Sequence, residues 1–113
     1  MTGGASGIGR AASIMLAEAG AAVTIVDLDA TAGETVTRQI LQAGGKAMFI
    51  RGDVSQADDC RNVVEETVAA WGRVDILFNN AGIIRRLTVT ELSEEDWDRV
   101  MAVNVKSMFL MCK

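Results

Sequence analysis

Several residue types are missing from this chain of 113 residues, and each absence removes a class of function. There is no histidine, which takes away the commonest general base and the commonest zinc ligand. There is no run of lysine or arginine, and the net charge is -4, so we expect neither a nucleic-acid partner nor a membrane partner. No apolar stretch approaches the length of a membrane span, and the first residues lack the regions of a signal peptide. A cytoplasmic location is therefore the expectation.

Cysteine is scarce as well. Cys60 and Cys112 are far apart in the sequence and match no metal-binding spacing, so we expect two reduced thiols and no metal site. What the chain does have is a composition typical of globular proteins, with 50% hydrophobic and 23% charged residues. Its length suffices for one domain, which we assign to residues 1–113.

The hydrophobic pattern predicts helices and strands in alternation. Short apolar runs rich in β-branched residues indicate strands that are buried on both faces, and the longer periodic segments indicate helices. Alternation of this kind is typical of parallel strands joined by right-handed crossovers, an α/β doubly wound sheet. The expected helices are residues 6–19, 29–43, 55–71 and 93–113, and the expected strands are residues 22–26, 47–50 and 74–78.

Helix ends carry recognisable signals. Asp29 is expected to cap the second helix, and Ser55 and Ser93 are expected to cap the third and fourth, each with an aspartate three residues later. In the first helix, Ile8, Ala12, Met15 and Leu16 share one face.

A glycine cluster at the mouth of the first helix, residues 3–9, is the first candidate for chemistry. Glycines there let backbone N–H groups approach a pyrophosphate, and the helix N-terminus adds partial positive charge. Asp27 ends the next strand 18 residues after Gly9, a spacing that suits a carboxylate bound to ribose hydroxyls. The alternatives are a flexible tail before a capped helix, and a turn residue or cap at Asp27. Together the two features favour a dinucleotide site.

Four sequence motifs, in the expected order, indicate one particular protein family. Residues 2–9, Thr-Gly-Gly-Ala-Ser-Gly-Ile-Gly, resemble the cofactor motif of the classical short-chain dehydrogenases/reductases. Residues 79–82, Asn-Asn-Ala-Gly, are similar to the family's second signature, Asp53-Val54 stands where the family contacts adenine, and Asn104 resembles the asparagine of the catalytic tetrad. The resemblance covers essentially the whole chain and implies a Rossmann-like NAD(P)-binding domain.

The resemblance also implies roles for individual residues. Asn104 would be the one catalytic residue present, kinking its helix and binding a water in a proton relay; alternatively it is a core amide bonded to backbone. Asn79 would hold the loop over the adenosine side with Gly82, or form a simple strand-ending turn. The implied cofactor-binding residues are Thr2, Gly3, Ser6, Gly7, Ile8, Gly9, Asp27, Asp53, Val54, Asn79, Ala81 and Gly82.

The sequence departs from the family pattern at both ends. Only the last residues of the family's first strand are present, and that strand lies beside the strand of Asp27 and the strand of residues 74–78. We therefore expect an incomplete sheet with unpaired edges and an incomplete core. The family's catalytic serine, and its tyrosine and lysine, would lie beyond Lys113, and the chain contains no tyrosine. We therefore interpret it as the N-terminal cofactor-binding portion of such an enzyme.

The function implied by the resemblance is hydride transfer between a nicotinamide cofactor and a secondary alcohol or ketone. Asp27 favours NAD over NADP because it would repel a 2′-phosphate. Arg85 and Arg86 could attract a carboxylate, as in sugar-acid dehydrogenases, and a 3-oxoacyl substrate is equally compatible. The whole protein is expected to be a homo-oligomer. The alternatives are a non-catalytic nucleotide-binding module, a truncated gene product, and a piece that folds only with a complementary chain.

Overall fold

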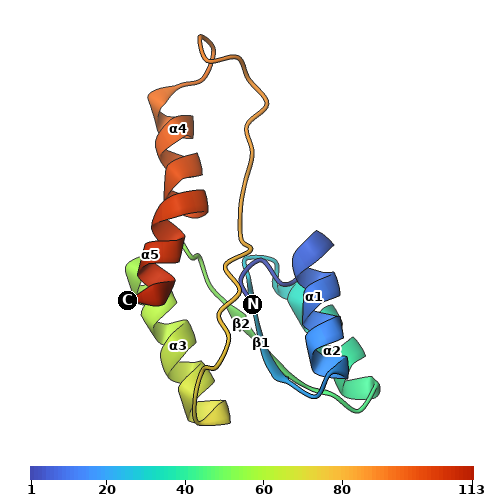
Figure 1. Ribbon diagram of the computed structural model, residues 1–113. Coiled ribbons are helices and arrows are strands. Elements are labelled where there is room, and N and C mark those ends of the chain that lie inside the picture. Colours follow the sequence, from blue (N-terminus) through green and yellow to red (C-terminus); the bar gives the residue numbers. More distant parts are fainter.

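The computed structural model describes all 113 residues and has the expected α/β architecture (Figure 1). Its elements, in chain order, are α1 (Gly7–Glu18), β1 (Ala22–Asp27), α2 (Ala30–Gln42), β2 (Lys46–Arg51), α3 (Ala57–Trp71), α4 (Glu94–Met101), the π-helical turn η1 (Ala102–Lys106) and α5 (Ser107–Cys112). No helix combines the length and the apolar character that crossing a membrane requires.

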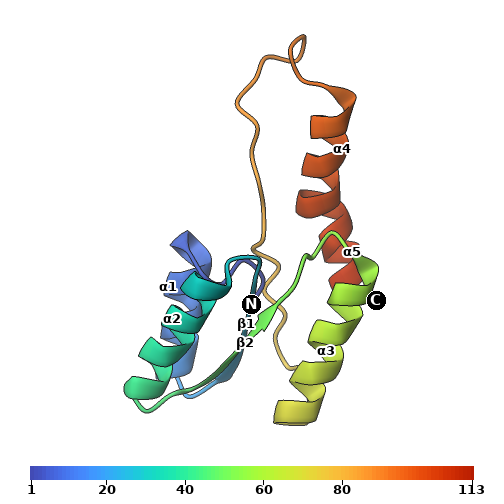
Figure 2. The same cartoon turned by 180° about the vertical axis from the view of Figure 1, so that it is seen from behind.

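The sheet consists of two parallel strands. β1 and β2 pair in register from Ala22 opposite Lys46 to Asp27 opposite Arg51, and α2 forms the crossover between them. Helices α1 and α2 cover one face of the sheet, and α3 and α5 lie on the other side (Figures 1 and 2). This three-layer arrangement confirms the doubly wound α/β prediction.

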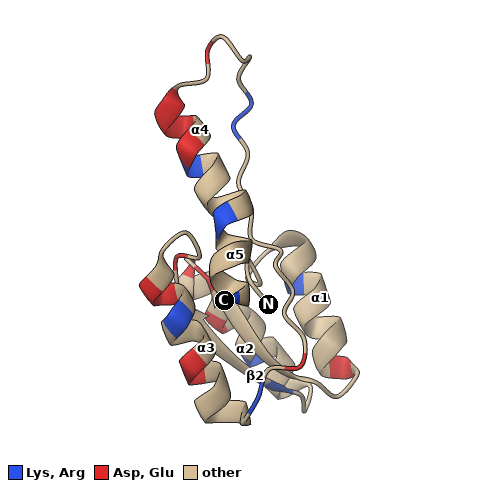
Figure 3. Cartoon of the chain, turned by 60° about the vertical axis from the view of Figure 1, so that its left-hand side comes forward, with Lys and Arg blue, Asp and Glu red and all other residues tan.

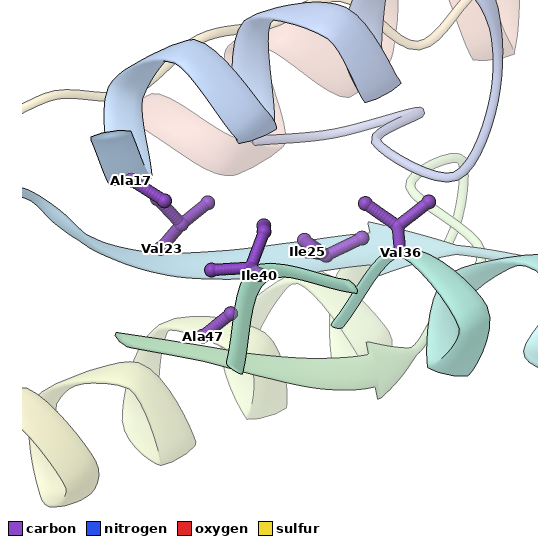
Figure 4. Close-up of a cluster of buried hydrophobic side chains, with 6 residues drawn as sticks. All are labelled: Ala17, Val23, Ile25, Val36, Ile40 and Ala47. Carbon is purple, nitrogen blue, oxygen red and sulfur yellow. The ribbon is translucent and has the colours of Figure 1, made fainter. Parts of the chain in front are cut away.

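Each face of the sheet has its own apolar core. Because successive side chains of a strand point to opposite faces, Val23 and Ile25 of β1 meet α1 and α2, while Val26 points to the other side. Figure 4 shows the first cluster, Ala17, Val23, Ile25, Val36, Ile40 and Ala47. The second consists of Val26, Ile50, Val54, Cys60, Val63 and Met111.

Helix α1 approaches the sheet through small residues. Its buried positions are Gly9, Ser13 and Ala17, spaced four apart on one stripe. Of the larger residues that the hydrophobic pattern grouped together, Leu16 is partly buried and packs against this core, whereas Ile8 is 74% exposed and Met15 is 67% exposed. The physical reason is distance, because small side chains let the helix backbone come close to the sheet and to the turn that precedes it.

The helix caps were predicted with mixed success. Asp29 accepts a hydrogen bond from the Ala32 amide, and Ser93 accepts one from the Asp96 amide, as expected. The prediction for Ser55 was wrong, because the cap of α3 is Gln56 and makes no side-chain cap hydrogen bond.

The last helix is not α-helical throughout. A π-helical turn, η1, separates α4 from α5, but the backbone stays helical through all three segments, as one predicted helix requires. Such turns insert one residue into the helical repeat and are often found at functional sites. Asn104 lies within η1.

Residues 74–78, predicted as a strand, have no regular strand partner and are not a strand in the structure. Met1 and Thr2 nevertheless show where the missing partner belongs. The Thr2 amide donates to the Phe78 carbonyl at 3.1 Å, and the Val26 amide donates to the Met1 carbonyl at 2.9 Å. Thr2 therefore lies between β1 and residues 74–78, in the place that the sequence assigned to the end of a central strand.

Where that strand would continue, a groove of about 950 Å³ separates β1 from residues 74–78. Most of its lining is hydrophobic, and Val74 and Ile76 beside it are 47% and 69% exposed. The core is therefore incomplete beside β1, as the sequence predicted. Above the groove, the loop of residues 82–93 and helix α4 project as an arm, which gives the chain its extents of 50 × 25 × 21 Å (Figure 1).

Candidate functional site

A second cavity of about 950 Å³ opens at the carboxyl ends of β1 and β2. The start of α1 forms one wall, the segments after β1 and β2 form the floor, and α4 with η1 forms the opposite wall. Ligands of open α/β sheets bind at this edge. Nine of the residues implied by the resemblance line it: Gly3, Ser6, Gly7, Ile8, Asp27, Asp53, Val54, Ala81 and Gly82.

The first turn of α1 is open toward the cavity. Ser6 caps the helix without a side-chain hydrogen bond to it, and the first turn carries no acidic residue. The amides at this end are therefore not occupied by a side chain of the helix itself, and the helix dipole adds partial positive charge. Gly7 has φ +49° and no atom within 4 Å of the position of an added Cβ, so a side chain there would enter the cavity.

Gly9 has a different role from Gly7. A Cβ at Gly9 would lie only 2.0 Å from the carbonyl oxygen of Gly3 and 2.6 Å from Nδ2 of Asn80. Gly9 is buried and does not line the cavity. Its lack of a side chain lets α1 pack against the glycine turn, so it supports the shape of the cavity from beneath.

Asp27 is held at the rim of the cavity by two backbone amides. Its Oδ2 accepts from the Ala5 amide at 3.1 Å, and its Oδ1 accepts from the Asp29 amide at 3.2 Å. The residue is half-buried. These bonds make Asp27 a turn residue, and they also fix the direction of its carboxylate, whose oxygens each have capacity for a further hydrogen bond.

The loop after β2 forms the floor beside Asp27. Oδ1 of Asp53 accepts from both the amide and the hydroxyl of Ser55, and the Asp53 amide donates to Asp59 of α3 at 2.8 Å. Val54 is 8% exposed and joins the core through its contact with Cys60. Burial, with a smaller contribution from the charges of Asp59 and Asp53, raises the pKa of the Cys60 thiol, which donates to the Val54 carbonyl.

Thr2 does not line the cavity but clamps two of its walls together. Its hydroxyl accepts from the amides of Asn80 and Ala81 at 3.0 and 3.1 Å, and it lies 3.4 Å from the Phe78 carbonyl oxygen. Thr2 is only 2% exposed. The side chain of Asn80 completes the clamp by donating to the carbonyls of Thr2 and Gly3.

The two asparagines of the Asn-Asn-Ala-Gly motif therefore differ. Asn80 lines the cavity and bonds the glycine turn, whereas Asn79 lies outside the lining, with a single contact of 3.7 Å to the Cys112 sulfur. The residue assignments from the sequence named Asn79 and left Asn80 out. Adjacent residues of an extended segment point to opposite sides. This alternation could have indicated from the sequence that only one of the two asparagines faces the cavity.

Asn104 bonds backbone rather than facing the cavity. Its Oδ1 accepts from the Ile83 amide and its Nδ2 donates to the Ile83 carbonyl, both at 2.8 Å. The amide side chain therefore ties η1 to the segment after the Asn-Asn-Ala-Gly motif. Its neighbours Ala102 and Val103 line the cavity.

The two arginines of the arm are not a free pair. Arg85 forms an ion pair with Asp96 of α4 at 2.9 Å, which joins the two sides of the arm. Arg86 is exposed and has no ion-pair partner.

The donor set fits a dinucleotide. The open first turn of α1 and the bare Gly7 suit a pyrophosphate, and the anchored carboxylate of Asp27 suits a ribose diol. The apolar Val54 and Val103, which also line the cavity, suit a flat aromatic base.

Comparison with known proteins agrees with this geometry. The model of the short chain dehydrogenase family matches residues 1–113. An uncharacterized oxidoreductase of Thermotoga maritima is 49% identical over 113 residues, and tropinone reductase-like 1 of Erythroxylum coca is 44% identical over 117. Both matches cover 100% of this chain but only 44% and 42% of those proteins, so the chain spans less than half their length.

Solved structures show the same likeness. A short-chain type dehydrogenase/reductase of Mycobacterium marinum superposes with a TM-score of 0.95 at 34% identity, covering 99% of this chain and 44% of that one. A metagenomic short-chain oxidoreductase, solved in complex with NADP, gives a TM-score of 0.91 at 34% identity, covering 97% of this chain and 50% of that one.

Proposed function

This chain belongs to the short-chain dehydrogenase family, and from that premise we propose that it is the cofactor-binding portion of an NAD-dependent oxidoreductase. The observation that carries the proposal is the joint placement of Gly7 and Asp27 on one cavity. An open helix start and an anchored carboxylate face it together, at the carboxyl edge of a parallel sheet.

Each wall of the cavity has a task in this proposal. The amides at the start of α1 bind the pyrophosphate, and the Asp27 carboxylate accepts from the adenosine ribose hydroxyls. Asp53 and Val54 contact the adenine. Thr2 and Asn80 hold the segment of Ala81 and Gly82 against the glycine turn, so the remaining wall keeps its position.

We propose NAD as the preferred cofactor because of the charge at the rim. Three carboxylates line the cavity, Asp27, Asp53 and Asp98, against one cation, Arg99, and Asp27 is followed by the apolar Leu28. A 2′-phosphate would bring further negative charge close to Asp27. One structural relative holds NADP, so the preference rests on the residues of this chain and not on the family.

The nicotinamide cofactor supplies hydride transfer when bound, and we propose a secondary alcohol or ketone as the substrate class. The chain has neither tyrosine nor histidine, so neither of these two residue types can protonate a ketone oxygen from within these residues. Asn104 positions η1 and Ile83 beside the cavity. A sugar acid would need a cation, and Arg86 is the unpaired candidate on the arm, while a 3-oxoacyl substrate is equally compatible.

We also propose that the whole protein is a homo-oligomer, as the resemblance implies. Helices α4 and α5 with η1 support this, because they expose apolar side chains: Trp97 is 55%, Val105 49% and Phe109 64% exposed. The cytoplasmic location predicted from the sequence stays a prediction.

The test uses a chimera in which residues 1–113 replace the 113 residues they match in the Thermotoga maritima oxidoreductase. The rest of that protein then supplies the remainder of the sheet. We expect the chimera to melt cooperatively and to bind NADH, seen as enhanced nicotinamide fluorescence that AMP displaces. A chimera that melts cooperatively but binds neither NADH nor AMP would contradict the proposal.

A further inference from the structure

One cation faces the cavity. Among its 20 lining residues, Arg99 of α4 is the single lysine or arginine. Arg99 takes part in none of the three ion pairs of the chain. Three of the four acidic residues of α4 lie in its first turn (Figure 3), and the fourth, Asp98, precedes Arg99 and lines the cavity with it.

The position of Arg99 follows from the helix repeat. Arg99, Ala102 and Val103 are three and four residues apart, which places them on one helix face, and all three line the cavity. Arg99 is thus one turn further out along the arm than Val103. Arg99 is exposed and lines the cavity from the α4 wall.

The loop after β2, which forms part of the cavity floor, is tied to the same helical segment. Met111 of α5 packs in the same buried cluster as Val54 and Cys60, which ties the C-terminal end of this helical segment to that loop and to α3. Both segments contribute to the lining of the cavity, Asp53 and Val54 from the loop, and Val103 and Arg99 from the helical segment. The glycine turn of α1 forms the other side.

We propose that Arg99 is a further cofactor-binding residue, whose guanidinium stacks on the adenine held between Val54 and Val103. This inference rests on the proposed dinucleotide function. A guanidinium is planar and delocalised and packs face to face on aromatic rings, which a lysine ammonium does not do. Adenine then lies between an apolar floor and a cationic cover, and the α4 wall contributes to binding.

The experiment measures dissociation constants by calorimetry in the chimera, for NAD and AMP directly and for nicotinamide mononucleotide by competition. The variants are Arg99→Met, which keeps an unbranched apolar stem, and Arg99→Lys, which keeps the charge. Arg38→Met is the matched control, because Arg38 is an exposed arginine of α2 that does not line the cavity. We expect Arg99→Met to weaken NAD and AMP by roughly 3- to 30-fold. Arg99→Lys should recover only part of the loss, and nicotinamide mononucleotide and Arg38→Met should show no change.

Other outcomes overturn the inference. If Arg99→Met binds NAD and AMP as tightly as the parent, Arg99 makes no contact. If Arg99→Lys restores full affinity, or if nicotinamide mononucleotide weakens equally, the effect is one of charge and adenine stacking is wrong. If the unsubstituted chimera binds no NAD or AMP at all, the proposed function fails and this inference fails with it, a result distinct from the others.

Discussion

Replacing Thr2 with valine removes one hydroxyl from the clamp between the glycine turn and the segment of residues 78–81. The Thr2 hydroxyl accepts from two amides, those of Asn80 and Ala81, and the residue is 2% exposed. Valine has nearly the same shape, so the packing is kept while both amides lose their acceptor. The change therefore isolates the hydrogen bonds from the volume of the side chain.

The magnitude follows from the number of groups left unpaired. Each buried donor without a partner costs about 1–3 kcal/mol, and these amides are partly buried, so about 1–2 kcal/mol each applies. Two amides give a loss of about 2–4 kcal/mol in the free energy of unfolding. In a domain of about 250 residues this lowers Tm by roughly 5–15 °C.

Urea unfolding of the chimera, followed by circular dichroism, measures the effect. Thr2→Ser keeps the acceptor and should retain most of the stability. The matched control is Thr35→Val on α2, where an exposed threonine donates its hydroxyl to the Thr31 carbonyl, and there we expect a change under about 0.5 kcal/mol. If Thr2→Val unfolds within about 0.5 kcal/mol of the parent at an unchanged slope, the clamp does not hold these walls together.

Three further predictions concern the cofactor, the chemistry and the sheet. Asp27→Ala in the chimera should lower the NAD to NADP ratio of kcat/KM by roughly tenfold or more, because a charge beside the 2′-position is removed; an unchanged ratio would show that Asp27 does not set the preference. Residues 1–113 alone should oxidise no NADH with a panel of ketones, since acid catalysis worth about 10²–10⁴-fold is missing; turnover by the purified chain would refute this. Five apolar β-forming residues placed before Met1 should fill the groove beside β1 and sharpen the thermal melt of the isolated chain. Slow hydrogen exchange in residues 23–26 and 76–78 of the unextended chain, with a sharp melt of a monomer, would show that the groove matters less than we infer.

The layers of the fold could be predicted because the hydrophobic pattern is local. The runs at residues 22–26 and 47–50 become β1 and β2, and α1, α2 and α3 each end close to a glycine, as α3 does at Gly72 with φ 84°. Residues 74–78 follow the same pattern but form no strand. A strand requires a partner, and the one backbone hydrogen bond between this segment and the first residues joins Thr2 to Phe78.

The sequence predicted the site residues whose proposed role depends on their own type, a glycine that bares the backbone or a single charged side chain. Gly7 and Asp27 face the cavity as their types suggested. Gly9 and Thr2 belong to the same motif, yet they support the cavity from behind, through a close approach and a buried hydroxyl that depend on three-dimensional neighbours. Arg99 was not predicted, because only the three-dimensional placement of the arm shows which of its residues line the cavity.

The most direct test of the dinucleotide site compares two glycines, one that lines the cavity and one that does not. Gly7 and Gly20 both have positive φ, +49° and +95°, and an added Cβ at either would meet no atom within 4 Å. Gly7 lines the cavity and Gly20 does not. Calorimetric titration of the chimera with NAD should show saturable binding that Gly7→Ala weakens at least tenfold and Gly20→Ala leaves unchanged, at comparable thermal stabilities of the two variants. Equal NAD affinities for the two variants would contradict the placement of the pyrophosphate at the start of α1.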